Sequence, residues 1–227
     1  MCHWKDGDLW VVEIENFGCE TSQGSLTLHN YFGDSWGLLC SHPDDYTPVC
    51  TTELSRLAQL DNAGEFSKRN MKVIGLSCND VESHKGWMED IKAYGKEEVK
   101  YPIIADKNRT VACNLGMLSQ DDKDKEGLPL TVRSVFIIDP KKKIRFILTC
   151  PATTGRNFDE ILRCIDSIQM TDGKGVATPA NWTPGSKTCV LPSISPEEAE
   201  KKFPKGVEVI DLPSGKPYLR MTPDPSA

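Results

Sequence analysis

Short apolar runs alternate with amphipathic stretches along the first 170 residues of the chain. Apolar runs of strand length lie at 36–40, 73–76, 101–105, 134–138 and 144–148. Between and after them, apolar residues recur at helical spacing over 48–70, 81–94, 110–115 and 158–169. The segment Asp139-Pro140-Lys141-Lys142-Lys143 separates the last two apolar runs and predicts a hairpin turn. This order of elements predicts an α/β fold, with a mixed sheet flanked by helices.

The composition changes near residue 170. Nine of the fifteen prolines fall within 171–227, and such a segment is too short and too rich in proline for a large core of its own. Its clearest helix is predicted at 196–202, because Ser195 suits the N-cap and Pro196 the first helical position. We therefore expect a main domain over 1–170 and a small carboxy-terminal dimerisation domain over 171–227, which makes the protein a homodimer.

Charge and hydropathy restrict the partners. With 27 basic and 33 acidic residues, the net charge is −6, which argues against a nucleic-acid partner, since such proteins need a large basic face. The first eight residues lack the apolar core of a secretory signal, and no apolar run reaches the length of a membrane span. We expect a cytoplasmic protein without a membrane span.

Nine cysteines are spread along the chain, and no two are closer than ten residues. A structural zinc site needs cysteine pairs two to four residues apart, and a thioredoxin-type dithiol needs a C-x-x-C. Neither spacing occurs here, and an odd number of cysteines without a secretory signal fits reduced thiols better than a disulfide framework. We expect no metal and no cofactor.

One cysteine stands at a predicted helix start. Thr47 is a good N-cap and Pro48 favours the first helical position, so Cys50 falls in the first turn. The free N–H groups and the helix dipole stabilise an anion there, and a thiol in that place ionises more easily than a free one. A reactive thiolate is one interpretation; a buried structural cysteine is the other.

The segment around this cysteine resembles a known family. Pro43-x-x-x-Thr47-x-x-Cys50 is similar to the active-site signature of peroxiredoxins, and 42–54 resembles their one-cysteine subgroup closely. Segments similar to those of the one-cysteine subgroup also lie at 33–37, 128–133, 150–160, 176–179 and 212–216. The resemblance implies a thioredoxin-like fold and a peroxidase that reduces hydrogen peroxide and organic hydroperoxides.

The resemblance also implies roles for several side chains. The Cys50 thiolate would attack the O–O bond and become a sulfenic acid. Thr47 would offer its hydroxyl to the thiolate and the peroxide, or serve only as the N-cap. Pro43 would shield the site from water. Arg133, at the start of a strand, would place its guanidinium beside Cys50, because its fork of N–H groups suits a thiolate and a peroxide oxygen together.

Three further residues complete the expected site. Glu53 and Arg156 resemble the partners that orient the active-site guanidinium. His42 would affect substrate access, although a lone histidine before a turn is more often structural.

The expected resolving cysteine is missing. Two-cysteine relatives carry Val-Cys-Pro in the carboxy-terminal arm, where this chain has Val176-Ala177-Thr178-Pro179. An external thiol or other small reductant is then expected to reduce the sulfenic acid, unless another cysteine reaches it. Cys40, Cys78, Cys150 and Cys164 lie in apolar patterns, and we expect them to be buried and inert.

A second motif suggests a rival enzyme class. Gly33-Asp34-Ser35-Trp36-Gly37 fits the G-x-S-x-G of serine hydrolases, but a strand rather than a helix is predicted after the serine. Some one-cysteine peroxiredoxins are assigned a phospholipase activity at this serine, with a histidine matched by His29. Lys141 occupies the expected aspartate position and Asp139 lies nearby, which argues against this activity. The alternative that is not an enzyme is a non-catalytic redox sensor.

Overall fold

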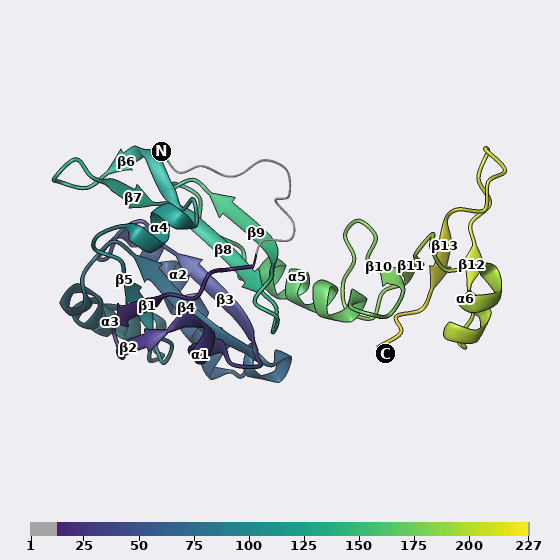
Figure 1. The fold of residues 1–227 in the computed structure, drawn as a ribbon, viewed down its shortest axis with the longest axis horizontal. Coiled ribbons are helices and arrows are strands. Elements are labelled where there is room, and N and C mark those ends of the chain that lie inside the picture. Colours follow the sequence, from purple (N-terminus) through teal and green to yellow (C-terminus); the bar gives the residue numbers. More distant parts are fainter. Residues whose placement is uncertain (1–12, 227) are drawn as a thin grey trace. The chain divides into compact units, whose positions relative to one another are not determined.

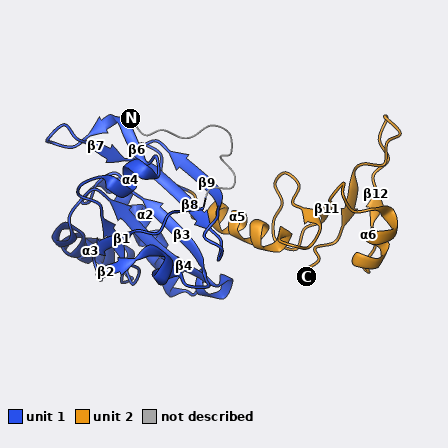
Figure 2. Ribbon diagram, viewed as in Figure 1, with its two compact units in different colours: residues 1–156 blue, residues 157–227 orange. Residues whose placement is uncertain are grey.

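The computed structural model describes residues 13–226 (Figure 1). The chain forms two compact units, residues 1–156 and 157–227 (Figure 2). The boundary lies 14 residues before the predicted one, because helix α5 (Phe158–Thr171) contacts β10 (Val176–Ala177) and contributes Met170 to the core of the second unit.

A seven-stranded mixed sheet forms the centre of the first unit, in the order β2-β1-β5-β4-β3-β8-β9. Strands β3, β4 and β5 run parallel, while β8 is antiparallel to both β3 and β9. Their bounds are β1 Gly18–Thr21, β2 Gly24–Thr27, β3 Trp36–Ser41, β4 Met71–Ser77, β5 Ile103–Ala105, β8 Arg133–Ile138 and β9 Ile144–Cys150. Strands β6 (Leu118–Lys123) and β7 (Pro129–Thr131) form a separate two-stranded ribbon. The sheet confirms the predicted fold class.

Four α-helices belong to this unit: α1 Leu28–Phe32, α2 Pro48–Asn62, α3 Val81–Gly95 and α4 Thr110–Asn114. The predicted helix over 48–70 is too long. Helix α2 ends at Asn62, Gly64 then adopts a left-handed φ of 77°, and a short 3-10 turn, Ser67–Arg69, precedes a left-handed Asn70. These conformations end the helix and lead the chain into β4.

The central strand β3 is buried at every position, because the sheet is covered on both faces. One core cluster includes Leu28 and Phe32 of α1, Leu39 of β3 and Ile74 of β4. Gly37 is required beside this cluster, since a Cβ there would lie 2.5 Å from the Phe32 ring. The loop that carries the candidate site residues leaves from the other, carboxyl end of β3, at Ser41.

The second unit has a small four-stranded antiparallel sheet, ordered β10-β11-β13-β12, with β11 Thr188–Val190, β12 Glu208–Val209 and β13 Arg220–Thr222. Its core includes Trp182 and Phe203. Helix α6 (Pro196–Lys202) begins as predicted, with Ser195 and Glu198 forming a capping box. None of the helices within 13–226 is long and apolar enough to cross a membrane.

Candidate active site

The first turn of α2 places Cys50 as predicted. Thr47 is extended at the N-cap, with φ −113° and ψ 147°, Pro48 is the first helical residue, and Cys50 is completely buried. The Thr47 hydroxyl does not cap the helix. It donates to the Asp44 carbonyl at 2.9 Å, so the expected donation to Cys50 is not made in this arrangement.

Arg133 reaches Cys50 from the first residue of β8. Its NH1 lies 3.3 Å from the Cys50 Sγ and 2.7 Å from Glu53 Oε2. Its Nε and NH2 both donate to the Ala152 carbonyl, at 2.9 and 2.7 Å. Only 3% of Arg133 is exposed. The guanidinium is thus fixed in plane from three sides, with one N–H group directed at the sulfur.

Glu53 joins Arg133 to a second buried guanidinium. Arg156 donates from its backbone N–H and its Nε to Glu53 Oε1, at 2.6 and 3.0 Å, and from NH2 to Oε2 at 2.8 Å. The remaining NH1 of Arg156 donates to the Ser134 carbonyl. Glu53 therefore contacts Arg133 and Arg156 together, and Arg156 reaches Arg133 through this carboxylate.

The charges of this cluster favour an anion at the sulfur. Burial alone would raise the pKa of Glu53, but the hydrogen bonds and charge of Arg156, together with the charge of Arg133, hold that pKa below its usual value. Two guanidinium cations and one carboxylate leave one positive charge uncompensated in a buried site. A negative charge on the Cys50 sulfur would balance it.

Burial dominates the titration of three other thiols. Burial raises the pKa of Cys40, Cys78 and Cys164 to about 11 in each case. These three are buried, as expected, whereas Cys150 is only half-buried. At neutral pH the three buried thiols stay protonated, and a protonated thiol is a poor nucleophile.

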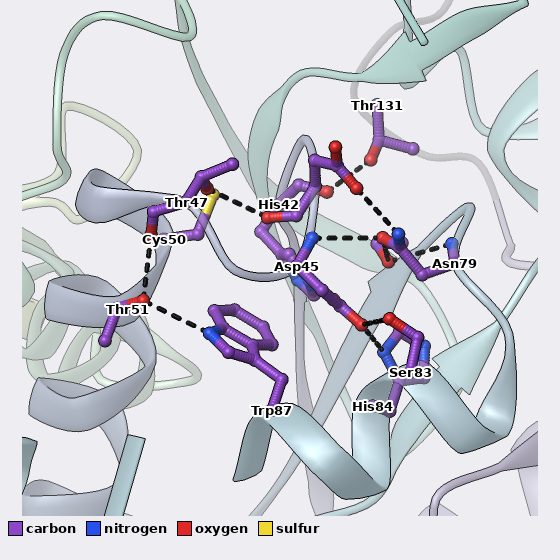
Figure 3. A network of polar contacts seen from close by, with 12 residues as sticks. His42, Asp45, Thr47, Cys50, Thr51, Asn79, Ser83, His84, Trp87 and Thr131 are labelled. Carbon is purple, nitrogen blue, oxygen red and sulfur yellow. Dashed lines mark hydrogen bonds and ion pairs between the residues drawn. The ribbon is translucent and has the colours of Figure 1, made fainter. Parts of the chain in front are cut away.

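The loop between β3 and α2 is held against α3 by a buried polar network (Figure 3). Asp45 accepts from His42 Nε2 and His84 Nδ1, each at 2.8 Å, and from the Ser83 hydroxyl at 2.7 Å. Next to it, the Trp87 indole donates to the Thr51 hydroxyl at 3.1 Å. His42 was singled out from the sequence; Asp45 and His84 were not.

The network has the residue types of a metal site, since the ligand atoms of His42, Asp45 and His84 lie within 4.8 Å of one another. A metal would need both facing ring nitrogens free of hydrogen. Instead each nitrogen lies at hydrogen-bond distance from its own carboxylate oxygen. The arrangement therefore fits a carboxylate held by two N–H donors better than a metal centre.

The residues proposed for a serine hydrolase have separate partners. The Ser35 hydroxyl donates to Asn70 Oδ1 at 3.0 Å, and His29 Nε2 lies 2.8 Å from the Ile14 carbonyl. Asp139 accepts from the Lys143 backbone and from Arg145. Within the described part of the chain, no hydrogen bond links Ser35, His29 and Asp139, and Ser35 precedes a strand.

Comparisons with known proteins cover almost the whole chain. Residues 12–147 match the model of the AhpC/TSA family, and residues 167–206 match the C-terminal domain of 1-Cys peroxiredoxin. Peroxiredoxin-6 of Gallus gallus is 55% identical over 94% of this chain and 96% of its own. Peroxiredoxin-6 of Homo sapiens is 54% identical over 92% and 95%.

Two solved structures are also similar. A mutant of the peroxiredoxin 6 of Arenicola marina superposes with a TM-score of 0.93 at 50% identity, covering 97% of this chain and 100% of that one. A yeast mitochondrial 1-Cys peroxiredoxin superposes with a TM-score of 0.84 at 49% identity, covering 93% and 97%. The thiol resolving mechanism of that yeast protein works via glutathione and thioredoxin systems.

Proposed function

The chain belongs to the AhpC/TSA family and is a thiol-dependent peroxidase of the 1-Cys peroxiredoxin type, with a thioredoxin-like fold; on this premise we propose that Cys50 attacks the peroxide. The contact between Arg133 NH1 and the Cys50 Sγ carries this proposal. It pairs the cysteine with a fixed cation, at the helix start where an anion is most stable.

Each bond change in the reduction of a hydroperoxide can be assigned to one or more of these residues. The Cys50 thiolate attacks one peroxide oxygen of ROOH, the S–O bond forms and the O–O bond breaks. The attacked oxygen keeps its hydrogen, which gives Cys50–SOH, and the leaving alkoxide takes a proton from water to give ROH. Arg133 stabilises the thiolate and the charge that develops on the peroxide, while Glu53 and Arg156 hold Arg133 in place.

Pro43 and Thr47 have supporting roles in this proposal. Pro43 is a buried residue of the loop between β3 and α2 and would limit the entry of water to the sulfur. Thr47 fixes the start of α2 through its carbonyl, which accepts from both the backbone N–H and the hydroxyl of Thr51.

Regeneration needs an external thiol. The arm has Ala177 and Thr178 where two-cysteine relatives have their resolving cysteine. A first thiol R'SH would displace water from Cys50–SOH to give a mixed disulfide, and a second would release R'SSR' and the free Cys50. Glutathione or thioredoxin is the class of reductant named for the yeast relative.

Mass spectrometry tests the assignment of the nucleophile. After one equivalent of hydrogen peroxide and trapping of sulfenic acid, Cys50 should carry the label, and Cys50→Ser should abolish rapid peroxide reduction. Cys164→Ser is the matched control and should react like the parent protein. Fast turnover in Cys50→Ser would refute the assignment.

We also propose a cytoplasmic homodimer. Strand β9 is the last strand of the large sheet and pairs with β8 on one side, so its other edge suits a second copy of the chain. Seven of the eight cysteines in the described residues are free thiols, which suits a reducing compartment; Cys113 is disulfide-bonded, so the expectation of reduced thiols fails at that position. Sedimentation equilibrium tests the dimer and cell fractionation the location; a monomer at micromolar concentration would contradict the first.

A further inference from the structure

Cys150 lies directly opposite the active-site arginine. It is the last residue of β9, and its Cα is paired with that of Arg133 across the antiparallel strands β8 and β9. Side chains directly opposite each other in such a pair lie on the same face of the sheet, with their Cβ atoms about 4.5–5.5 Å apart. On this face Arg133 reaches Cys50 and Glu53 of α2. The Cys150 side chain therefore lies on the face of the sheet that carries Cys50.

The segment that follows Cys150 stays close to the first turn of α2. The Ala152 carbonyl accepts from the same guanidinium whose NH1 contacts the Cys50 Sγ. Farther along, a Cβ on Gly155 would lie 3.5 Å from the side chain of Val49, the residue before Cys50. One guanidinium thus contacts Cys50 directly and also binds a carbonyl only two residues from Cys150.

Burial distinguishes Cys150 from three other thiols of the chain. Cys150 is half-buried, whereas Cys40, Cys78 and Cys164 are buried, and burial raises the pKa of each of these three to about 11. A thiol attacks another sulfur as its thiolate, which these three do not form at neutral pH. Cys40 is also fixed in β3, which pairs with β4 on one side and β8 on the other. Cys150 ends the outermost strand of its sheet and is less constrained.

The start of α2 is suited to release Cys50 after oxidation. Cys50 is completely buried, so the added oxygen of a sulfenic acid needs room there. No side chain caps the helix at Thr47, and Tyr46 just before it has a left-handed φ of 54°, which costs free energy in a residue other than glycine. A disulfide requires Cα atoms about 4.4–6.8 Å apart. Unwinding of this first turn would relieve the strain at Tyr46 and let the Cys50 sulfur approach a neighbouring thiol.

We propose that Cys150 is a resolving cysteine, which forms a disulfide with Cys50 within one chain. This inference rests on the proposed function, in which Cys50 becomes the sulfenic acid. The Cys150 thiolate attacks the sulfur of Cys50–SOH, the S–S bond forms and the S–O bond breaks. The leaving hydroxide and the proton given up by the Cys150 thiol make water. Cys150 thereby replaces the first external thiol, and two molecules of R'SH then reduce the disulfide and leave as R'SSR'.

Peptide mapping by mass spectrometry tests this bond directly. One equivalent of hydrogen peroxide is added without external thiol, the remaining thiols are alkylated, and the protein is digested without reduction. The parent protein should lose two hydrogen atoms, stay monomeric on a denaturing non-reducing gel, and yield a peptide pair that joins Cys50 to Cys150. A bond from Cys50 to any other cysteine, or a lasting sulfenic acid in the parent, would overturn the proposal.

Cys150→Ser tests the consequence for Cys50. Without the second thiol, Cys50 should gain one oxygen atom and stay open to a sulfenic-acid trap. In about tenfold excess of peroxide, the fraction of sulfinic acid at Cys50 should be about fivefold higher than in the parent. Cys164→Ser removes a buried thiol of α5 and should form the Cys50–Cys150 bond as the parent does. Equal sulfinic fractions in Cys150→Ser and the parent would contradict the role of Cys150.

The outcomes separate this inference from the proposed function. Oxidation of Cys50 without a bond to Cys150 refutes the resolving role while Cys50 stays the nucleophile. A parent protein in which peroxide leaves Cys50 unoxidised refutes the proposed function itself. If Cys150→Ser does not fold, the peptide map of the parent protein decides the question alone.

Discussion

Arg156 and Glu53 lie 103 residues apart in the sequence and are joined by three hydrogen bonds in the buried site. Arg156 is the last residue of the first unit, and Glu53 lies one helical turn after Cys50. The pair joins helix α2 to the segment between β9 and α5. Since Glu53 also holds Arg133, we expect stability and catalysis to depend on the same carboxylate.

Glu53→Gln should therefore affect both properties. The substitution leaves two buried guanidinium groups without a countercharge, and losing one partner of a buried ion pair costs about 3–5 kcal/mol. Urea unfolding should show this loss, and the peroxide rate should fall because Arg133 loses an anchor. Glu65→Gln removes a partly exposed surface pairing with Lys68 and Arg69 and should change stability far less. Equal effects of the two substitutions would contradict this account of Glu53.

Arg133→Lys tests the planar geometry of the guanidinium. Arg133 directs one nitrogen to Cys50 and Glu53 and two others to the Ala152 carbonyl. A lysine keeps the charge but cannot occupy all these places. The rate of peroxide reduction in stopped flow should fall at least tenfold, about 1.4 kcal/mol of barrier. The control is Arg145→Lys, at an arginine that contacts Asp139. A parent-like rate in Arg133→Lys would show that Arg133 acts through its charge alone.

The sequence predicted those parts of the candidate site whose structure depends on neighbouring residues in the chain. Thr47 and Pro48 determine the helix start within a few residues, so the place of Cys50 in the first turn followed from them. The role of Arg133 came from the resemblance, because an arginine at a strand start gives no signal of its own. The contact between Arg133 and Cys50 depends on the pairing of strands β3 and β8, which the sequence alone does not show.

Other features depended on contacts between distant segments. Asp45 and His84 are separated by 39 residues, and nothing in either segment predicts that their side chains meet. The β1–β2 hairpin was missed because 18–27 is largely polar and lacks a strand pattern. The early end of α2 depends on left-handed backbone at Gly64 and Asn70, which amphipathic periodicity over 48–70 does not reveal.

The pH dependence of stability should reflect the buried His42. Burial lowers its pKa in the folded protein below the unfolded value of about 6.5. The neutral ring is favoured by the fold, so its stabilising contribution is complete above about pH 6.5 and is lost as the pH falls. Between pH 7.5 and 5, urea unfolding should show falling stability, with a slope of at most about 1.4 kcal/mol per pH unit from this one proton.

His42→Gln should flatten this slope, whereas His29→Gln should keep it. Glu53 does not interfere in this range. Its folded pKa is also lowered, but the unfolded value is about 4.3, so its contribution is lost only at more acidic pH. An unchanged slope in His42→Gln would show that another group takes up the proton.

Ser35→Ala tests the rival hydrolase activity. An acyl-transfer serine needs a histidine within hydrogen-bond reach and a carboxylate that orients the ring. Here the Ser35 hydroxyl donates to Asn70, His29 Nε2 meets the Ile14 carbonyl, and Asp139 binds Lys143 and Arg145. The substitution should leave the peroxide rate within about threefold, under about 0.7 kcal/mol of barrier, and phospholipid cleavage should be weak in both proteins. Strong cleavage by the parent that disappears in Ser35→Ala would instead require a rearrangement that brings His29 to the serine. Asp139, two residues before Lys141 at the expected aspartate position, would then be the candidate carboxylate.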